Sequence, residues 1–163
     1  MNELTMLGEK SIWELPKTAF LSSSKFGPGS VLKSYDFASK MKLAGKCVIS
    51  GFQSKLERDV LDLLLDGDSP LIMVHACGMP ESAPVKLREH ISSGRLLIVS
   101  PFDKRVKRVH RGLALQRNQF IVDNADEVVF AYMRSGGMLE QLKMREGVPV
   151  YVLDGENTTT ERI

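Results

Sequence analysis

The residues best suited to binding or chemistry lie in one stretch, between positions 116 and 137. A predicted helix carries Arg117 and Asn118. An apolar strand follows, and it leads into the turn Ser135-Gly136-Gly137. A glycine-rich turn between a strand and a helix presents backbone N–H groups to an anion, and an arginine suits the same phosphate or carboxylate. The stretch therefore predicts half of an anion or nucleotide pocket.

Arg117 lies on the apolar face of its predicted helix, four residues after Leu113 and four before Ile121. A guanidinium on that face must find a partner, because an unpaired buried charge is costly. The partner is either a bound ligand or a structural group, such as a carboxylate or backbone carbonyls. We favour a combined structural and ligand-binding role.

The composition indicates one globular domain. The 163 residues are 43% hydrophobic and 26% charged, and a chain of this length can bury a sizeable core. No apolar run approaches the roughly 18 residues of a membrane span, and no signal-peptide pattern opens the chain. The two cysteines, Cys47 and Cys77, indicate no disulfide framework. We therefore expect a cytoplasmic protein without membrane contact.

Positive charge is concentrated in one segment of an otherwise acidic chain. The formal net charge is +2, from 22 basic and 20 acidic residues. Positions 104 to 122 contain no acidic residue but six basic ones: Lys104, Arg105, Lys107, Arg108, Arg111 and Arg117. Without these six, 16 basic residues face 20 acidic ones, a balance of −4. The asymmetry favours contact with a polyanion over a merely solvated surface.

Short apolar runs alternate with amphipathic segments after Pro16. The runs mostly lack polar alternation, as strands buried on both faces do. Predicted strands are Thr18–Ser22, Lys46–Ser50, Leu71–Ala76, Leu96–Ser100, Glu127–Met133 and Pro149–Leu153. Predicted helices are Ser30–Ala44, Leu56–Leu65, Pro84–Ser92, His110–Asn124 and Gly137–Arg145. The pattern predicts an α/β fold, a Rossmann-like doubly wound and mostly parallel sheet with helices on both faces.

We divide the chain into an N-terminal extension (1–16), a Rossmann-like domain (17–153) and a polar tail (154–163). The extension is predicted to form a short helix or an edge segment that covers the core. Doubly wound sheets bind ligands at the carboxyl ends of their strands, near a switch in strand order. The loops after the strands should therefore carry the function.

Two of these loops add candidate binding residues. After the first strand, Ser24 and Lys25 lie in a loop that suits a phosphate or ribose, although a flexible loop leading into a helix cap explains it equally well. After the second strand, Ser50 and Gly51 allow a ligand close to the backbone, although a tight turn alone also explains the glycine. The spacing matches no P-loop or dinucleotide fingerprint, so no cofactor is predicted.

The loop after the third strand holds His75 and Cys77, which invite a metal site or a cysteine nucleophile. Zinc needs three or four converging ligands, and no matching Cys or His pair occurs elsewhere. A nucleophilic cysteine needs a neighbouring base, and the sequence shows none. We therefore predict neither a metal site nor a catalytic residue.

Four motifs, in this order, resemble those of a known family: Val48-Ile-Ser-Gly51, His75-Ala-Cys-Gly-Met79, Arg117-Asn-Gln-Phe-Ile121 and Arg134-Ser-Gly-Gly137. They are similar to DNA-processing protein A (DprA, also called Smf), within the SMF/DprA–LOG (SLOG) superfamily of Rossmann-like domains. The resemblance spans roughly Lys17 to Leu153. The chain departs from the family where Ser-Gly-Leu-Ala-x-Gly-Ile-Asp becomes Ser50-Gly-Phe-Gln-Ser-Lys-Leu-Glu57, and where Gly-Ser-Arg becomes Ser22-Ser-Ser-Lys25.

The resemblance implies a protein that binds single-stranded DNA or a nucleotide and acts in DNA processing or recombination. It also implies a homodimer and a recombinase as partners. Carried over by position, it places six residues in a basic pocket: Ser50, Gly51, Arg117, Asn118, Ser135 and Gly136. Five neighbours complete the candidate site: Ser24, Lys25, Arg105, Arg108 and Gly137.

Two other functions stay open. One is a nucleotide-sensing domain without catalysis. The other is a LOG-like phosphoribohydrolase acting on nucleoside monophosphates. The LOG signature Pro-Gly-Gly-x-Gly-Thr-x-x-Glu is only partly matched by Ser135-Gly-Gly-Met-Leu-Glu140, which lacks the Gly-Thr pair. The sequence therefore favours binding over catalysis without excluding an enzyme.

Overall fold

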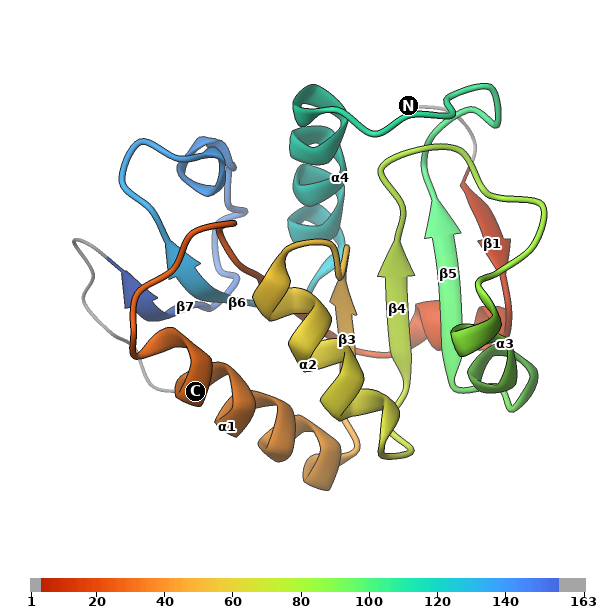
Figure 1. The fold of residues 1–163 in the computed structure, drawn as a ribbon, viewed down its shortest axis with the longest axis horizontal. Coiled ribbons are helices and arrows are strands. Elements are labelled where there is room, and N and C mark those ends of the chain that lie inside the picture. The colour runs from red at the N-terminus through yellow and green to blue at the C-terminus, as the bar shows by residue number, and fades with distance from the viewer. Residues whose placement is uncertain (1–3, 156–163) are drawn as a thin grey trace.

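A computed structural model describes residues 4–155 as one seven-stranded sheet flanked by helices (Figure 1). The strands lie in the order β1-β5-β4-β3-β2-β6-β7, and every neighbouring pair is parallel except β1 and β5. Their bounds are β1 Thr5–Leu7, β2 Lys17–Leu21, β3 Cys47–Ser50, β4 Leu71–Val74, β5 Leu96–Ser100, β6 Glu127–Met133 and β7 Val150–Gly155. The predicted Rossmann-like α/β fold is confirmed.

Helices cover both faces of the sheet because both faces are apolar. The helices are α1 Ser30–Ala44, α2 Lys55–Leu65, α3 Val85–Ser92 and α4 Arg111–Asn124, with the 3-10 turns η1 Lys10–Glu14 and η2 Met138–Gln141. In Figure 1, α1, α2 and α3 lie in front of the sheet and α4 lies behind it. On the front face Phe20 stacks on Phe37 of α1, and on the back face Leu21 and Ile49 pack with Ile121 of α4. No helix within residues 4–155 is long and apolar enough to cross a membrane.

The prediction of a fifth helix at Gly137–Arg145 is wrong, because only the short turn η2 forms there. The reason lies in α4. The Gln119 side chain accepts a hydrogen bond from the N–H of Lys143 at 3.0 Å and donates one to its carbonyl at 2.9 Å. Both backbone groups that a helix would need are therefore occupied. Leu139, within η2, and Leu142, directly after it, still pack into the core.

Both segments outside the predicted domain contribute to the sheet. The N-terminal segment contains an edge strand, β1, and a short 3-10 helix, η1, which buries Ile12. At the other end, β7 continues through Asp154 and Gly155, two residues into the segment predicted as a tail. The rest of that predicted tail, residues 156–163, lies outside the described part of the chain.

The sheet reverses its winding at β2. Strands β3, β4 and β5 follow one another on one side of β2, whereas β6 and β7 lie on its other side. The loops that leave β2 and β6 therefore diverge toward opposite helix layers, and such a switch point leaves a crevice at the carboxyl edge of the sheet. The fold thus brings the loops after β2, β3 and β6 together.

Candidate anion-binding site

A cavity of about 450 Å³ lies at the carboxyl ends of β2, β3 and β6, beside α4. We call it the carboxyl-edge pocket. Its wall combines three arginines, one glutamate, small polar residues and a short apolar side: Ser22, Ser23, Ser24, Gln53, Ser54, Glu57, Arg111, Ala114, Arg117, Asn118, Arg134, Ser135, Gly136, Gly137, Met138 and Leu139. The pocket occupies the switch point of the sheet, where the topology favours a ligand.

Arg117 lies deep in this pocket, and only 4% of the residue is exposed. Its Nε donates to the Oδ1 of Asn118 at 2.7 Å, and its Nη2 donates to the Oε1 of Gln53 at 2.9 Å. Burial lowers the pKa of the guanidinium, and the nearby Glu57 carboxylate opposes this effect. An arginine nevertheless keeps its charge in proteins. Arg117 is thus a buried cation held by neutral amide oxygens.

The guanidinium of Arg117 retains unused donors. Its Nη1 has no hydrogen-bond partner, and the residue forms no ion pair, within residues 4–155. A guanidinium carries five N–H groups, and the two bonds to amide oxygens use only two of them. The arrangement fixes the side chain and leaves it able to bind an anion.

Gly51 makes room for Arg117. A Cβ at position 51 would lie 2.4 Å from Nη1 and 2.5 Å from Cζ of Arg117. Any larger residue would therefore push the guanidinium out of its place. The glycine that the sequence marked as a close backbone approach serves an arginine of the chain itself.

Glu57 joins two loops of the pocket from the first turn of α2. It is 3% exposed. Its Oε2 accepts from the N–H of Ser22 at 2.9 Å, and its Oε1 accepts from the N–H groups of Gln53 at 2.9 Å and Ser54 at 3.2 Å. A carboxylate that accepts several N–H groups forms strong, charge-assisted bonds. Glu57 therefore fixes the loops after β2 and β3 relative to each other.

The turn after β6 does not offer the free N–H groups that the sequence predicted. The N–H of Gly136 donates to the Oε1 of Glu140, and the N–H of Gly137 donates to the carbonyl of Arg134 at 3.0 Å. Gly136 has a φ of +74°, which suits a glycine. Because η2 has only four residues, no helix dipole supports the turn. The positive charge of the pocket therefore comes from side chains.

Two exposed arginines complete the basic character of the pocket. Arg111 opens α4, and Arg134 follows β6. Neither guanidinium has a hydrogen bond or ion pair within the described residues. The backbone N–H of Arg134 donates to the Oγ of Ser23 at 3.2 Å, which connects the loops after β2 and β6.

Six of the predicted site residues line the pocket: Ser24, Arg117, Asn118, Ser135, Gly136 and Gly137. Two lie behind it. Ser50 is fully buried, and its Oγ accepts from the N–H of Phe52 at 3.0 Å, while Gly51 lies against Arg117. Their part in binding stays a prediction.

The other three predicted residues, Lys25, Arg105 and Arg108, are exposed and do not line the pocket. Arg105 is paired with Asp103, its Nε donating to Oδ1 at 2.9 Å, and this bond holds the pKa of Asp103 at about 2. Of the six residues of the basic segment, only Arg111 and Arg117 line the pocket.

Sequence reasoning did not select seven polar residues of the lining: Ser22, Ser23, Gln53, Ser54, Glu57, Arg111 and Arg134. One signal was available. Ser54 and Glu57 have the Ser-x-x-Glu spacing of a capping box, which marks the start of α2 at the carboxyl edge. The approach of Gln53 to Arg117 carries no such local signal, because the two are 64 residues apart.

His75 and Cys77 belong to no cluster of three or more possible metal ligands within residues 4–155. Burial lowers the pKa of His75, and the charge of Arg117 lowers it further. The carbonyl of Cys77 accepts a hydrogen bond from the Ser100 hydroxyl at 2.6 Å. The effect on His75 shows that this loop lies near the charged guanidinium of Arg117.

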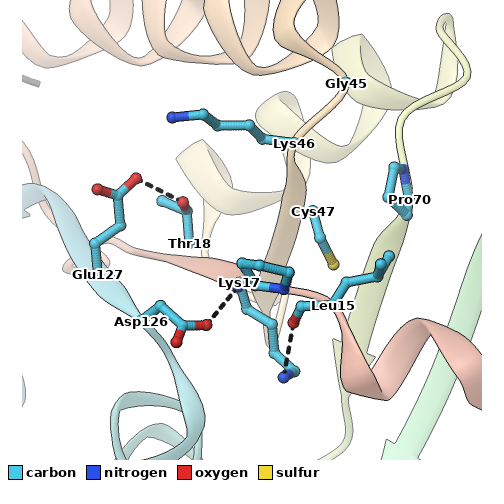
Figure 2. A pocket seen from close by; sticks show the side chains of 10 residues that line it. Leu15, Lys17, Thr18, Gly45, Lys46, Cys47, Pro70, Asp126 and Glu127 are labelled. Atoms are coloured by element: carbon cyan, nitrogen blue, oxygen red, sulfur yellow. Dashed lines mark hydrogen bonds between the residues drawn. The ribbon is translucent and has the colours of Figure 1, made fainter.

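A second cavity of about 450 Å³ lies at the amino ends of β2, β3 and β6, and we call it the amino-edge pocket (Figure 2). Asp126 accepts from the N–H of Lys17 at 2.7 Å, and Glu127 accepts from the Thr18 hydroxyl at 2.7 Å. Lys17 donates to the carbonyl of Leu15 at 3.0 Å. Cys47 also lines this cavity, and burial raises the pKa of its thiol to about 12.

The sequence matches no family model and no curated protein. Solved structures do resemble the fold. DNA processing protein A from Helicobacter pylori, which binds single-stranded DNA, superposes with a TM-score of 0.73 at 19% identity, over 97% of this chain and 74% of that protein. DprA from Streptococcus pneumoniae gives 0.67 at 18% identity, over 91% of this chain. The chain has the fold of DprA.

The two DprA structures match most of this chain, but the chain spans only 54% of the S. pneumoniae protein. The same fold occurs in proteins that bind another ligand. The molybdenum cofactor binding protein from Rippkaea orientalis superposes with a TM-score of 0.58 at 14% identity, over 88% of this chain and 78% of that protein. Fold resemblance therefore leaves the choice of ligand to the residues of the pocket.

Proposed function

We propose that this protein binds single-stranded DNA, holding phosphate groups in the carboxyl-edge pocket, and that it does so without catalysis. The observation that carries the proposal is the state of Arg117, a buried guanidinium held by two neutral amide oxygens, with donors to spare. The Glu57 carboxylate acts on Arg117 from a distance but forms no ion pair with it within residues 4–155. A buried charge without a direct partner is costly, and an incoming phosphate would supply one. The DprA fold supports nucleic acid as the source of that phosphate, since the H. pylori protein binds single-stranded DNA.

The pocket indicates contacts with phosphate and sugar rather than base stacking. The three phenylalanines near the strand ends do not line it. Phe52 and Phe102 are 5% and 6% exposed, and Phe26 packs against the core. Base stacking needs exposed aromatic faces. Binding should therefore depend steeply on salt, with a slope of log K against log salt of about −2 if three arginines each meet one phosphate.

The test is a titration of a fluorescent oligothymidylate at two salt concentrations, with the wild type, Arg117→Ala and Arg105→Ala. We expect Arg117→Ala to weaken binding by about 100-fold, the scale for truncating a buried charged partner. Arg105→Ala should cost far less, because its guanidinium is exposed and already paired with Asp103. Equal losses for both variants would show that diffuse charge, not the pocket, binds DNA.

A nucleotide sensor is the second candidate, and the volume of the pocket favours it. A cavity of about 450 Å³ falls in the range of small-molecule sites. Saturable binding of a mononucleotide without turnover, in the absence of oligonucleotide binding, would identify this function. Release of a free base would instead indicate a LOG-like hydrolase. The predicted homodimer, recombinase partner and role in DNA processing stay predictions.

A further inference from the structure

We propose that the carboxyl-edge pocket selects a terminal phosphate monoester, such as the 5′-phosphate at the end of a DNA strand, over the internal phosphodiesters of that strand. This inference rests on the proposed function and specifies its ligand. Three features of the pocket lead to it: the depth of Arg117, the balance of charge, and the presence of both polar and apolar residues in the wall.

The first feature is depth. Arg117 is only 4% exposed, although it lines the pocket. A group that reaches its free Nη1 must project from the ligand into the cavity. A terminal monoester projects in this way and carries three free oxygens. An internal phosphodiester has two free oxygens and a sugar on each side, so the strand itself holds it away from a recessed guanidinium.

The second feature is charge. Three arginines and one glutamate line the pocket, Arg111, Arg117 and Arg134 against Glu57, so the formal balance is 3 − 1 = +2. A phosphate monoester carries a charge of about −1.5 to −2 at pH 7, which matches this balance. A phosphodiester carries a single negative charge and would leave part of the positive charge unpaired.

The third feature is the wall. The lining includes the three serines of the loop after β2 and three apolar residues, Ala114, Met138 and Leu139. Hydroxyl groups suit the oxygens of a phosphate or a sugar, and the apolar residues suit one nucleoside. A cavity of about 450 Å³ holds one nucleotide at the end of a strand, and the next nucleotides must leave it.

The test compares two oligothymidylates with the same number of phosphate groups in a competition assay. One carries a 5′-phosphate. The other has a 5′-hydroxyl and one additional nucleotide, so that it contains one more phosphodiester. We expect the phosphorylated strand to bind at least about 10-fold more tightly, as charge-assisted bidentate contacts to arginine require. Thymidine 5′-monophosphate is the third ligand, and it shows whether the strand adds anything to the monoester.

Variants assign the selectivity to the pocket. Arg117→Ala should bring the affinity ratio of the two strands close to 1. Arg134→Ala, an exposed position that leaves the core unchanged, should reduce the same ratio and covers the case that Arg117→Ala does not fold. Lys46→Ala, which removes one exposed charge at the opposite edge (Figure 2), should leave the ratio as it is.

The outcomes separate the two proposals. Equal affinity for both strands, with both weakened by Arg117→Ala, would overturn monoester selection and keep DNA binding at the pocket. Binding of the monophosphate alone would support the monoester and overturn DNA as its source. If no ligand binds, the proposed function itself fails. A preference that survives both arginine substitutions would place the selective site elsewhere and overturn the inference.

Discussion

The two edges of the sheet carry cavities of similar volume, about 450 Å³ each, but they use their charged groups differently. At the amino edge, Lys17, Asp126 and Glu127 each bond to a backbone group or hydroxyl of the fold itself. At the carboxyl edge, Arg117 has donors that no group within residues 4–155 accepts. Lys46 at the amino edge is also unpaired within the described residues, but it is exposed to solvent. We infer that a buried charge with unused donors, rather than the size of a cavity, marks the carboxyl edge as the candidate binding site.

The largest expected effect is on DNA binding, and it should appear at one edge only. Arg117→Ala should weaken oligonucleotide binding by about 100-fold, or roughly 2.7 kcal/mol, because the phosphate loses the buried guanidinium that would bind it. Lys46→Ala removes the same formal charge from the amino edge and should change binding by less than about 2-fold. Fluorescence anisotropy measures both. A comparable loss in Lys46→Ala would erase the distinction between the edges.

The second effect concerns two glutamates. Glu57→Gln should lower the free energy of unfolding by about 2–3 kcal/mol, because the amide loses the negative charge and keeps only one acceptor oxygen, so that its NH2 group faces a backbone N–H that the carboxylate accepted. Glu127→Gln, at the amino edge, loses one charged acceptor for a hydroxyl and should cost no more than about 1 kcal/mol. Urea denaturation compares the variants. Equal costs would mean that Glu57 does not hold the pocket loops together.

Substitutions at two glycines should affect different properties, DNA binding at Gly51 and stability at Gly45. Gly51→Ala should displace the Arg117 guanidinium and weaken DNA binding by about 10-fold, with a smaller cost in stability because the obstructed group is the end of a side chain. Gly45 lies beside the amino-edge pocket with a φ of +66° and open space around it. Gly45→Ala should therefore cost about 1 kcal/mol of stability and leave binding unchanged. The opposite pattern in paired binding and denaturation assays would contradict both assignments.

The smallest effect is a pH dependence near the carboxyl edge. Burial and the charge of Arg117 lower the pKa of His75 below its usual 6.5. Well above pH 6.5 the imidazole is neutral in both the folded and the unfolded chain, so it causes no loss of stability there. As the pH falls below 6.5, the unfolded chain takes up a proton that the folded chain resists, and stability decreases. His75→Leu should flatten the dependence of unfolding free energy on pH between 6.5 and 5, which urea denaturation of both proteins across this range measures.

The sequence predicted the sheet well because each strand is a local apolar run. Predicted and observed bounds of β5 and β6 are identical. It failed at η2, because the bonds from Gln119 to Lys143 join positions 24 residues apart. The same limit applies to the pocket. Arg117 stands out by its place on an apolar helix face, whereas the contribution of Gln53 depends on a contact that no local pattern reveals.

The start of α1, which follows the loop with Ser22, Ser23 and Ser24, is anchored by the end of the sheet. Ser30 donates to the carboxylate of Asp154 at 2.9 Å, and Lys33 donates to the carbonyl of Leu153 at 2.9 Å, across 124 and 120 positions of sequence. Contacts of such separation form slowly, because the chain between them must first be ordered. During synthesis, β2 also waits for β6, its second neighbour. The pocket should therefore be completed only when β7 joins the sheet, so that a nascent chain would acquire the proposed binding capacity last.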